Sequence, residues 1–239
     1  MFLKKSRYKP LFKKFVRLRK NIQNRKKLLT NFEKKKWDNL ITFLRISSQR
    51  RKHNFKIYDQ LSFVVPKFGN SLKKKYLKNL LTKQRISLFY GNLQNKKLRN
   101  LVKRSKLNLI TNSNFSALEL LLNSLENRLD TILYRSHFVR SIREARLFIQ
   151  HKHVFVNNNI ITKNSFTISA GDIISLSEKS LSLAKINVYS SNLWPLPPEF
   201  LQINYRTFQI NVIDHEYKPQ LGIYFPFWLD LNTVINYYD

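Results

Sequence analysis

The chain has 239 residues, with 44 lysines and arginines against 14 aspartates and glutamates, and its formal net charge is +30. It contains no cysteine, which excludes disulfides, cysteine-based zinc sites and thiol catalysis, and no apolar run of the length that a transmembrane helix requires. Only four glycines occur, too few to build the glycine-rich loops that cradle phosphates or dinucleotides.

The positive charge is concentrated in the first half of the chain. Residues 1–115 carry 33 of the lysines and arginines and three of the acids, whereas residues 116–239 carry 11 of each kind. So large an excess opposes compact folding through self-repulsion, and it calls for a counter-charge. A membrane-surface protein usually concentrates its charge in one short amphipathic helix. Here the charge extends over more than a hundred residues among aromatic side chains, which favours RNA as the partner.

The first 30 residues form a basic arm with a narrow apolar stripe. Its apolar residues recur at steps of three and four, with one gap, as on one face of a helix: Leu11, Phe15, Leu18, Ile22 and Leu29. A mitochondrial targeting peptide would also be basic and free of acids, so that interpretation stays open. The many lysines and few serines favour a retained arm, whose predicted RNA contacts are Arg17, Arg19, Lys20, Arg25, Lys26 and Lys27.

Further helices are predicted over residues 33–46 and, in two parts, over residues 71–104. Gly91 and Asn92 mark a turn between these two parts. The apolar residues fall on one face and leave the other cationic. Such faces are often only solvated, but almost no acids are available here to pair with them. We therefore predict phosphate contacts for Lys83, Arg85, Lys96, Lys97, Arg99, Lys103 and Arg104.

Two capping boxes organise the centre of the chain. Ser116 with Glu119 begins a helix whose apolar residues continue at helical spacing to Leu133. Ser141 with Glu144 begins a second helix, and its N-terminal N–H groups suit a phosphate. This second helix is predicted to expose Arg143, Arg146 and Gln150.

The pattern then changes to the period of two that is typical of strands. Three asparagines, at positions 157–159, stand between two such runs, and asparagine tolerates the left-handed backbone of a hairpin turn. A second turn is expected at Gly171, before another strand. The module is thus two helices followed by a small sheet. Its predicted RNA contacts are Arg128, Arg135, Arg140, Ser141, Arg143, Arg146, Gln150, Lys152, His153, Asn157, Asn158 and Lys163.

Catalysis and metal binding are two other possible functions of the module, and the sequence supports them less well than RNA binding. Asp130 stands in an Arg-Leu-Asp stretch like the one that holds the catalytic aspartate of pseudouridine synthases. Here the stretch lies in an amphipathic helix without glycine, so we predict that Asp130 orients a neighbouring arginine. His151 and His153 could bind a metal, but no third ligand is evident, which favours contact with RNA or simple exposure at a strand edge. The chain is predicted to be no enzyme and to hold no metal or cofactor.

Aromatic residues are frequent after residue 190, where they could stack on unpaired bases. The alternation of Leu201, Ile203 and Tyr205 in a charge-balanced region instead favours a packed strand. Asp230 is expected to cap a last short helix. Four segments are predicted: a basic RNA-binding arm over 1–60, a helical domain over 61–115, the RNA-binding module over 116–180 and a C-terminal extension over 181–239.

The module resembles a known RNA-binding family on four short motifs. These are Arg-Leu-Asp at 128–130, Ser141 to Arg146, His153 to Asn158, and Gly-Asp-Ile at 171–173. Together they are similar to the S4 module, which is named after a ribosomal protein and also occurs in RNA-modifying enzymes. The stretches over 73–102 and 200–213 are similar to the segments that flank the module in organellar ribosomal S4 proteins. The sequence departs from the family at Ile142, where arginine is usual, at Asn158, where the turn glycine is usual, and in lacking the zinc-binding cysteines of some members.

The resemblance implies an α+β fold, with a basic helical region, the S4-type module and a C-terminal segment that packs back on the helical region. It implies a structural constituent of the mitochondrial small ribosomal subunit that binds and organises small-subunit rRNA, with ribosomal protein S5 as a neighbour. The implied location is the mitochondrial matrix, with an organelle gene indicated by the AT-rich type of composition, and neither a membrane nor a small-molecule substrate is expected. The alternative is a free RNA-binding factor with the same module, in ribosome rescue or as an RNA chaperone.

Overall fold

The computed structural model describes residues 72–111, 116–191, 193, 195–213, 225, 227, 229–230 and 232–238, together with Lys14, Leu18, Ile22 and Thr42. The chain divides into two compact units, one of Met1–Gly69 with Phe225–Leu229 and one of Asn70–Tyr224 with Asp230–Asp239. In the first unit Leu18 and Ile22, two members of the predicted apolar stripe, are buried. Most of the helix expected over 33–46 and most of the arm lie outside the described residues.

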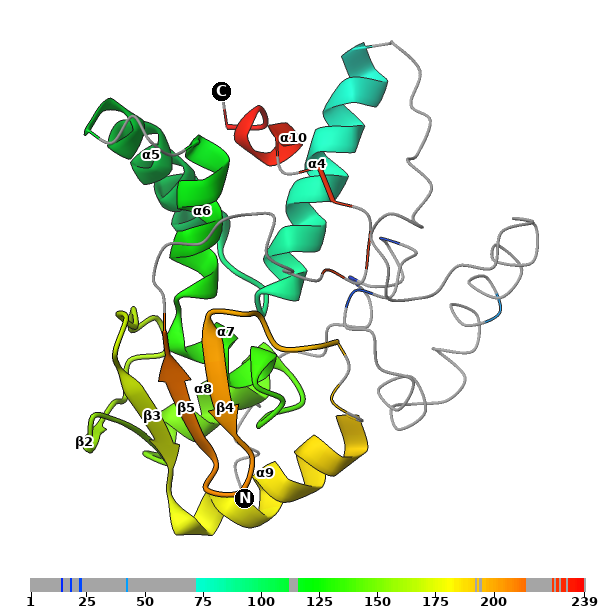
Figure 1. Cartoon of the computed structure of the whole chain (residues 1–239). Helices are drawn as coiled ribbons and strands as arrows, with labels where there is room; N and C mark the ends of the chain where they lie inside the picture. Colours follow the sequence, from blue (N-terminus) through cyan, green and yellow to red (C-terminus); the bar gives the residue numbers. More distant parts are fainter. Residues whose placement is uncertain are drawn as a thin grey trace, which may run out of the picture. The chain divides into compact units, whose positions relative to one another are not determined.

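The second unit begins with two helices, α4 over Leu72–Phe89 and α5 over Asn95–Thr111 (Figure 1). The turn between them holds Gly91 at φ +70° and Asn92 at φ +60°, which confirms the predicted turn. A left-handed backbone at two successive positions reverses the chain at little cost, because glycine has no Cβ to clash and asparagine tolerates this region.

The C-terminal segment packs back on α4, as expected. The short helix α10, Asn232–Ile235, packs against α4 (Figure 1). Lys78 of α4 forms an ion pair with Asp230 at 3.5 Å, and the Lys83 ammonium donates to the Tyr237 hydroxyl at 3.2 Å. These polar contacts join residues about 150 positions apart, so they depend on the tertiary fold alone.

Three helices form the helical part of the module: α6 over Ala117–Glu126, α7 over Leu129–Arg135 and α8 over Ile142–Gln150. The capping box of Ser116 and Glu119 is present as predicted. The single helix expected from Ser116 to Leu133 is wrong, because the chain leaves the helical conformation between α6 and α7.

A backbone interaction explains this break. Arg128 is extended, with φ −78° and ψ 138°, and forms an isolated bridge with Thr167. On either side of it, Leu129 N–H donates to the Phe166 carbonyl at 2.9 Å, and Ile168 N–H donates to the Asn127 carbonyl at 2.9 Å. The backbone of 127–129 thus pairs with 166–168 instead of continuing the helix. Residues 166–169 contribute an isolated bridge to this pairing and no strand of the sheet.

Within the described part of the chain, five antiparallel strands form one sheet in the order β2-β1-β3-β5-β4. They are β1 Val154–Val156, β2 Asn159–Ile160, β3 Ile173–Leu176, β4 Leu201–Asn204 and β5 Gln209–Val212. Asn157 and Asn158 turn the β1–β2 hairpin at φ 48° and 65°, as predicted. Two strands of this sheet come from the chain beyond residue 180, including the strand expected at Leu201 and Ile203.

Alternate residues of the strands point to opposite faces of the sheet. One face carries Val154, Ile174, Ile210 and Val212 into a core that it shares with α7 and α8. Helix α9, Glu178–Ser191, adds Ala184 to the same core. On the other face the polar residues of β4 and β5 are exposed, namely Gln202, Asn204, Gln209 and Asn211.

Candidate nucleic-acid interface

The N-terminus of α8 carries the predicted cap. The Ser141 hydroxyl accepts from the Glu144 N–H at 3.2 Å, as a capping box requires. The Glu144 carboxylate accepts from the backbone N–H of Arg140 instead of that of Ser141. A carboxylate therefore already faces this end of the helix, and the basic side chains around it have to supply the attraction for a phosphate.

Arg140 is the exposed cation at this end. Its Nε donates to the Asn187 side-chain oxygen at 2.6 Å, and the Asn187 amide nitrogen donates to the Phe138 carbonyl at 3.0 Å. Asn187 is 3% exposed, so a buried amide on α9 orients the guanidinium of the exposed Arg140. No local pattern predicts this role, because Asn187 lies 47 residues from Arg140. On α8 itself Arg143 is half-buried and Gln150 is exposed.

Arg146 does not face outward as expected. Its Nε donates to Asp130 Oδ2 at 2.8 Å, its Nη1 to the Gly91 carbonyl at 2.7 Å and its Nη2 to the Tyr90 carbonyl at 2.6 Å. Arg128 binds the same carboxylate through Nε at 2.9 Å and Nη2 at 2.8 Å. The guanidinium of Arg146 thus links α8 to α7 and to the turn after α4.

Asp130 accepts from both arginines and is 0% exposed. The prediction that it orients a neighbouring arginine is confirmed, and the carboxylate in fact holds two arginines. Charge-assisted bonds of this length are the strong ones, and here they join α7 to α8 and orient Arg146, whose other two donors bind the helical region.

Arg135 is also internal. Its Nε and Nη2 form a bidentate pair with Glu126 at 2.9 and 2.8 Å, the Tyr90 hydroxyl donates to the same carboxylate, and the guanidinium lies 5.3 Å from the Phe89 ring centre. Burial alone lowers the pKa of Arg135, but the charge and hydrogen bonds of Glu126 outweigh it and raise the pKa above its ordinary value. The sequence placed Arg128, Arg135 and Arg146 on an RNA-facing edge, whereas the structure directs all three into the protein.

Two cations of α4 are buried as well, Lys83 and Arg85, each 5% exposed. Lys83 lies 4.3 Å from the Tyr237 ring centre, and burial lowers its pKa. Burial also lowers the pKa of Arg85. The helical pattern predicted that Lys83 and Arg85 lie on an exposed cationic face, whereas the structure buries both side chains.

Among the described residues, helix α5 carries an exposed cationic surface. Leu98 and Val102 are 0% and 1% exposed, so the apolar stripe of the helix faces inward. The helix contains no acid. Its exposed cations are Lys96, Lys97, Arg99, Lys103 and Arg104, as predicted from the helical spacing.

The remaining predicted contacts lie around the β1–β2 hairpin. Lys152, Asn158 and Lys163 are exposed. Asn157 is used within the protein: its amide nitrogen donates to Asp172 Oδ1 at 2.8 Å and its oxygen accepts from the Ile173 N–H at 2.9 Å. This amide therefore fastens the hairpin to the turn before β3.

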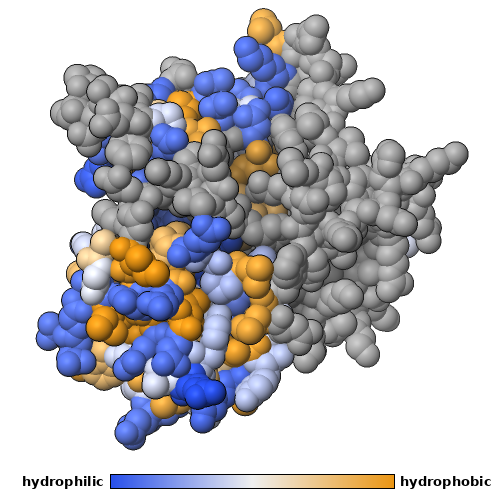
Figure 2. Space-filling view, viewed as in Figure 1, coloured by the Kyte–Doolittle hydropathy of each residue, from blue (hydrophilic) through white to orange (hydrophobic). Residues whose placement is uncertain are grey.

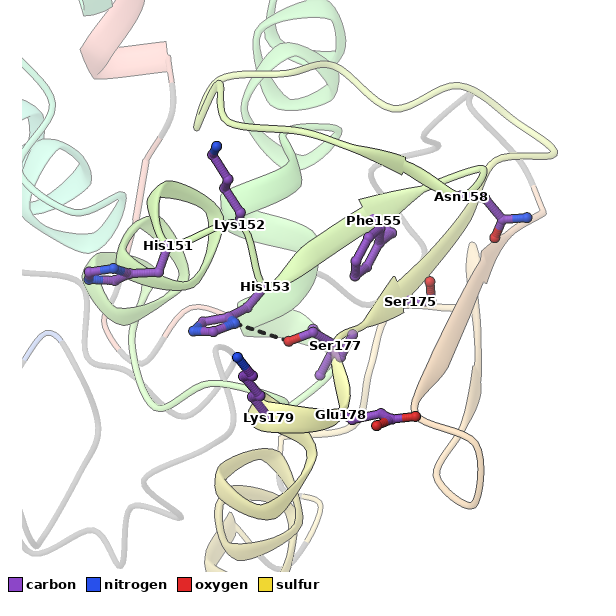
Figure 3. Close-up of a pocket in the computed structure, with 10 residues that line it drawn as sticks. His151, Lys152, His153, Phe155, Asn158, Ser175, Ser177, Glu178 and Lys179 are labelled. Atoms are coloured by element: carbon purple, nitrogen blue, oxygen red, sulfur yellow. Dashed lines mark hydrogen bonds between the residues drawn. The ribbon is translucent and has the colours of Figure 1, made fainter.

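A pocket of about 700 Å³ opens beside β1 (Figure 3). It is lined by His151, Lys152, His153, Phe155, Asn158, Ser175, Leu176, Ser177, Glu178 and Lys179. His153 Nδ1 lies 3.0 Å from the Ser177 hydroxyl, the hydrogen bond drawn in Figure 3. Lys152 and His153 were predicted from the sequence, whereas Phe155 and Lys179 were missed. The β-strand alternation that turns Phe155 away from the core was the available signal.

The predicted arm contacts Arg17, Arg19, Lys20, Arg25, Lys26 and Lys27 lie outside the described residues. Within the described ranges, no group of three histidine, cysteine or acidic residues could hold a metal ion. None of the helices that the structure describes combines the length and apolar composition needed to cross a bilayer.

Comparison with known proteins gives consistent matches. Residues 127–174 match the S4 domain. The chain is 35% identical over 211 residues to the small ribosomal subunit protein uS4m of Reclinomonas americana, covering 81% of this chain and 80% of that protein. It is 34% identical over 169 residues to uS4m of Marchantia polymorpha, covering 69% and 80%. It is 29% identical over 161 residues to uS4 of Pelagibacter ubique, covering 67% and 75%.

Proposed function

Since the chain belongs to the uS4 family of small ribosomal subunit proteins, with uS4m relatives of the mitochondrial type, we propose that it organises small-subunit rRNA by neutralising phosphates where RNA helices meet. It is a structural constituent of the small ribosomal subunit, and it acts in the mitochondrial ribosome. Its recognition of RNA depends on shape and backbone charge more than on base sequence.

The exposed cationic face of α5 is the main support for this proposal. Lysines and arginines without any acid on the same helix give a field that attracts a polyanion and has no counter-charge within the helix. On the S4 module, the proposed contacts are the exposed side chains Arg140, Gln150, Lys152, Asn158 and Lys163, with Arg143 and Ser141 beside the α8 N-terminus. The cations of the arm remain proposed contacts from the sequence.

The proposal contains no catalytic step. A catalytic aspartate needs access to a substrate, but Asp130 is buried and its carboxylate is occupied by Arg128 and Arg146. The role proposed for Asp130 is therefore structural: it holds these two arginines in place. We further propose ribosomal protein S5 as a neighbour and an organelle gene as the origin of the chain, on the resemblance and the composition stated above.

Purified small subunits test the proposal against its alternative, a free RNA-binding factor for ribosome rescue or RNA folding. A ribosomal constituent is expected to remain on the subunits in stoichiometric amount through a wash in about 0.5 M salt, because many phosphate contacts hold it at once and dissociation has to break them together. Quantitative mass spectrometry of washed subunits measures this amount, with other small-subunit proteins as the internal control. Complete loss of this chain, while those proteins stay, would contradict the proposal.

A further inference from the structure

The pocket beside β1 is lined by aromatic rings and hydroxyl groups as well as lysines, whereas the exposed face of α5 is cationic. The following inference about this pocket rests on the proposed RNA-binding function. We propose that this pocket binds an unpaired rRNA nucleotide, with its base against Phe155 and the histidine rings and its phosphate near Lys179. The proposed function of the protein is to bind phosphates of helical RNA. This pocket would in addition bind the base of an unpaired nucleotide.

Phe155 stands on the open face of the sheet. Its neighbours Val154 and Val156 are buried in the core, at 0% and 4% exposure, so strand alternation turns the Phe155 ring to the opposite side. Phe155 is paired across the sheet with Ile160 on one side and Ser175 on the other. It is half-buried and does not belong to the core cluster. A ring left on an open face offers a stacking surface to a base, since every base has a π-face.

Two further rings line the same pocket and are held in place. The ring centres of His151 and His153 lie 6.2 Å apart, and the His153 ring also meets Phe148 edge-on at 6.0 Å. The Ser177 hydroxyl bonds to His153 Nδ1 at 3.0 Å, and the Ser177 N–H donates to the His153 carbonyl at 2.9 Å. These bonds fix the His153 imidazole before any ligand arrives, which lowers the entropic cost of binding.

The charges at the rim suit a phosphate beside these rings. Lys152 and Lys179 are both exposed, and in Figure 3 the Lys179 side chain extends toward His153. Glu178 is the one acid of the lining, and Figure 3 shows its carboxylate directed away from His153 and Lys179. Ser175 and Asn158 add a hydroxyl and an amide that can bond to base edges.

Aromatic rings, hydroxyls and a lysine along one surface suit single-stranded RNA, which presents unstacked bases together with phosphates. The base faces of a duplex are stacked inside it and cannot contact a ring on the protein surface. The exposed isoleucines of the open face, Ile160 and Ile173, lie close by, and Figure 2 shows apolar residues among hydrophilic ones on the visible surface of the molecule. A neighbouring protein is therefore the competing occupant, and the experiment has to separate the two.

Small subunits assembled with Phe155→Leu test the proposal. Leucine keeps an apolar side chain on β1 but removes the π-face, so the sheet is retained while stacking is lost. The measurement is the reactivity of Watson–Crick edges toward dimethyl sulfate, with hydroxyl-radical cleavage reporting on the RNA backbone. We expect one to a few unpaired nucleotides to become several-fold more reactive, while the pattern of backbone protection stays as in the unchanged subunit.

A lysine pair provides the matched comparison. Lys179→Gln and Lys185→Gln make the same charge change on exposed positions of α9, but only Lys179 lines the pocket. Lys179→Gln should raise the reactivity of the same nucleotides, and Lys185→Gln should leave it unchanged. Equal effects of the two variants, or unchanged reactivity in both Phe155→Leu and Lys179→Gln, would overturn the proposal.

A photo-reactive benzoylphenylalanine introduced at position 155 identifies the occupant directly. Crosslinks to rRNA at the nucleotides found by chemical probing support the proposal, and crosslinks to a protein alone overturn it. This outcome is separate from the fate of the proposed function. If the chain stays on washed subunits but no base responds, only the nucleotide pocket is refuted, whereas loss of the chain from the subunits refutes the ribosomal role.

Discussion

At the scale of single residues, the surroundings of each arginine separate internal side chains from exposed ones. Asp130 and Glu126 are both 0% exposed, and between them they bind Arg128, Arg146 and Arg135. Taking such charges out of water is costly, so the pairs are stable only while every partner is present. Arg140, by contrast, is exposed and oriented by the neutral amide of Asn187. Four arginines that look alike in the sequence therefore have different surroundings: three are paired with buried carboxylates and one is exposed.

This difference predicts different outcomes for two equal substitutions. Arg146→Gln should lower the free energy of unfolding by about 3 kcal/mol, because it removes a charged partner of a buried carboxylate. Arg140→Gln should change it by less than about 1 kcal/mol and should instead weaken rRNA binding. Urea unfolding of the chain, followed by circular dichroism, and filter binding to rRNA measure the two quantities. Similar stability losses in both variants would contradict the assignment of Arg146 to the interior.

Gly91 is a second residue whose identity the fold requires. A Cβ at this position would lie 2.9 Å from Arg146 Cζ and Nη1, and φ is +70°. Gly171 has a similar φ of +85° but open space around it. Gly91→Ala should therefore cost about 2–3 kcal/mol of unfolding free energy and Gly171→Ala about 1 kcal/mol, since only the first displaces a bonded guanidinium. Denaturant unfolding of both variants measures these losses. Equal losses of unfolding free energy would mean that backbone strain alone accounts for the cost of each substitution.

At the scale of elements, α5 combines a structural face with a binding face. Leu98 and Val102 anchor the helix, and its other side projects cations without an acid. A helix with this division can lie along an RNA backbone without changing its own packing, because the cations extend from a surface that the core does not use.

Substitutions on this helix should change the salt dependence of binding more than the fold. The double variant Lys97→Gln with Arg104→Gln removes two exposed charges and should reduce the slope of log K against log salt by roughly 1–2, since each phosphate contact contributes about 0.7–0.9. The control is Lys97→Arg with Arg104→Lys, which keeps both charges and should retain most of the slope. Titrations of rRNA at several salt concentrations measure this, and an unchanged slope in the glutamine variant would place the RNA elsewhere.

At the scale of the whole molecule, the net charge of +30 is the dominant feature. Self-repulsion among these cations opposes the compact state, and phosphates of rRNA relieve it. The folded state of the free chain is therefore expected to be less stable than that of the chain on RNA.

Screening of this repulsion gives a measurable result. The Tm of the free chain should rise by several degrees between about 0.05 and 0.3 M potassium chloride, because the Debye length shortens from roughly 14 to 6 Å. Sucrose at equal osmolarity is the control, since it does not screen charge. A Tm that falls with salt would show that attractive ion pairs, such as Arg135 with Glu126, outweigh the repulsion.

The sequence by itself determined the features that depend on near neighbours. The capping box at Ser116, the turn at Gly91 and the asparagine hairpin could be predicted because each is a local backbone preference, and the excess of charge before residue 116 needs only counting. The four short motifs of the module indicated the family, and the comparisons agree.

Only the tertiary structure decided which cations are exposed and which are paired inside the protein. Arg146 reaches the carbonyl of Gly91, 55 residues away, and Arg140 is oriented by Asn187, 47 residues away. The break at Asn127 depends on pairing with residues 166–168, and β5 completes the sheet beside β3 from beyond the module. Burial and hydrogen-bond partners are properties of chain segments that meet in space, so no local pattern of arginine and leucine can reveal them.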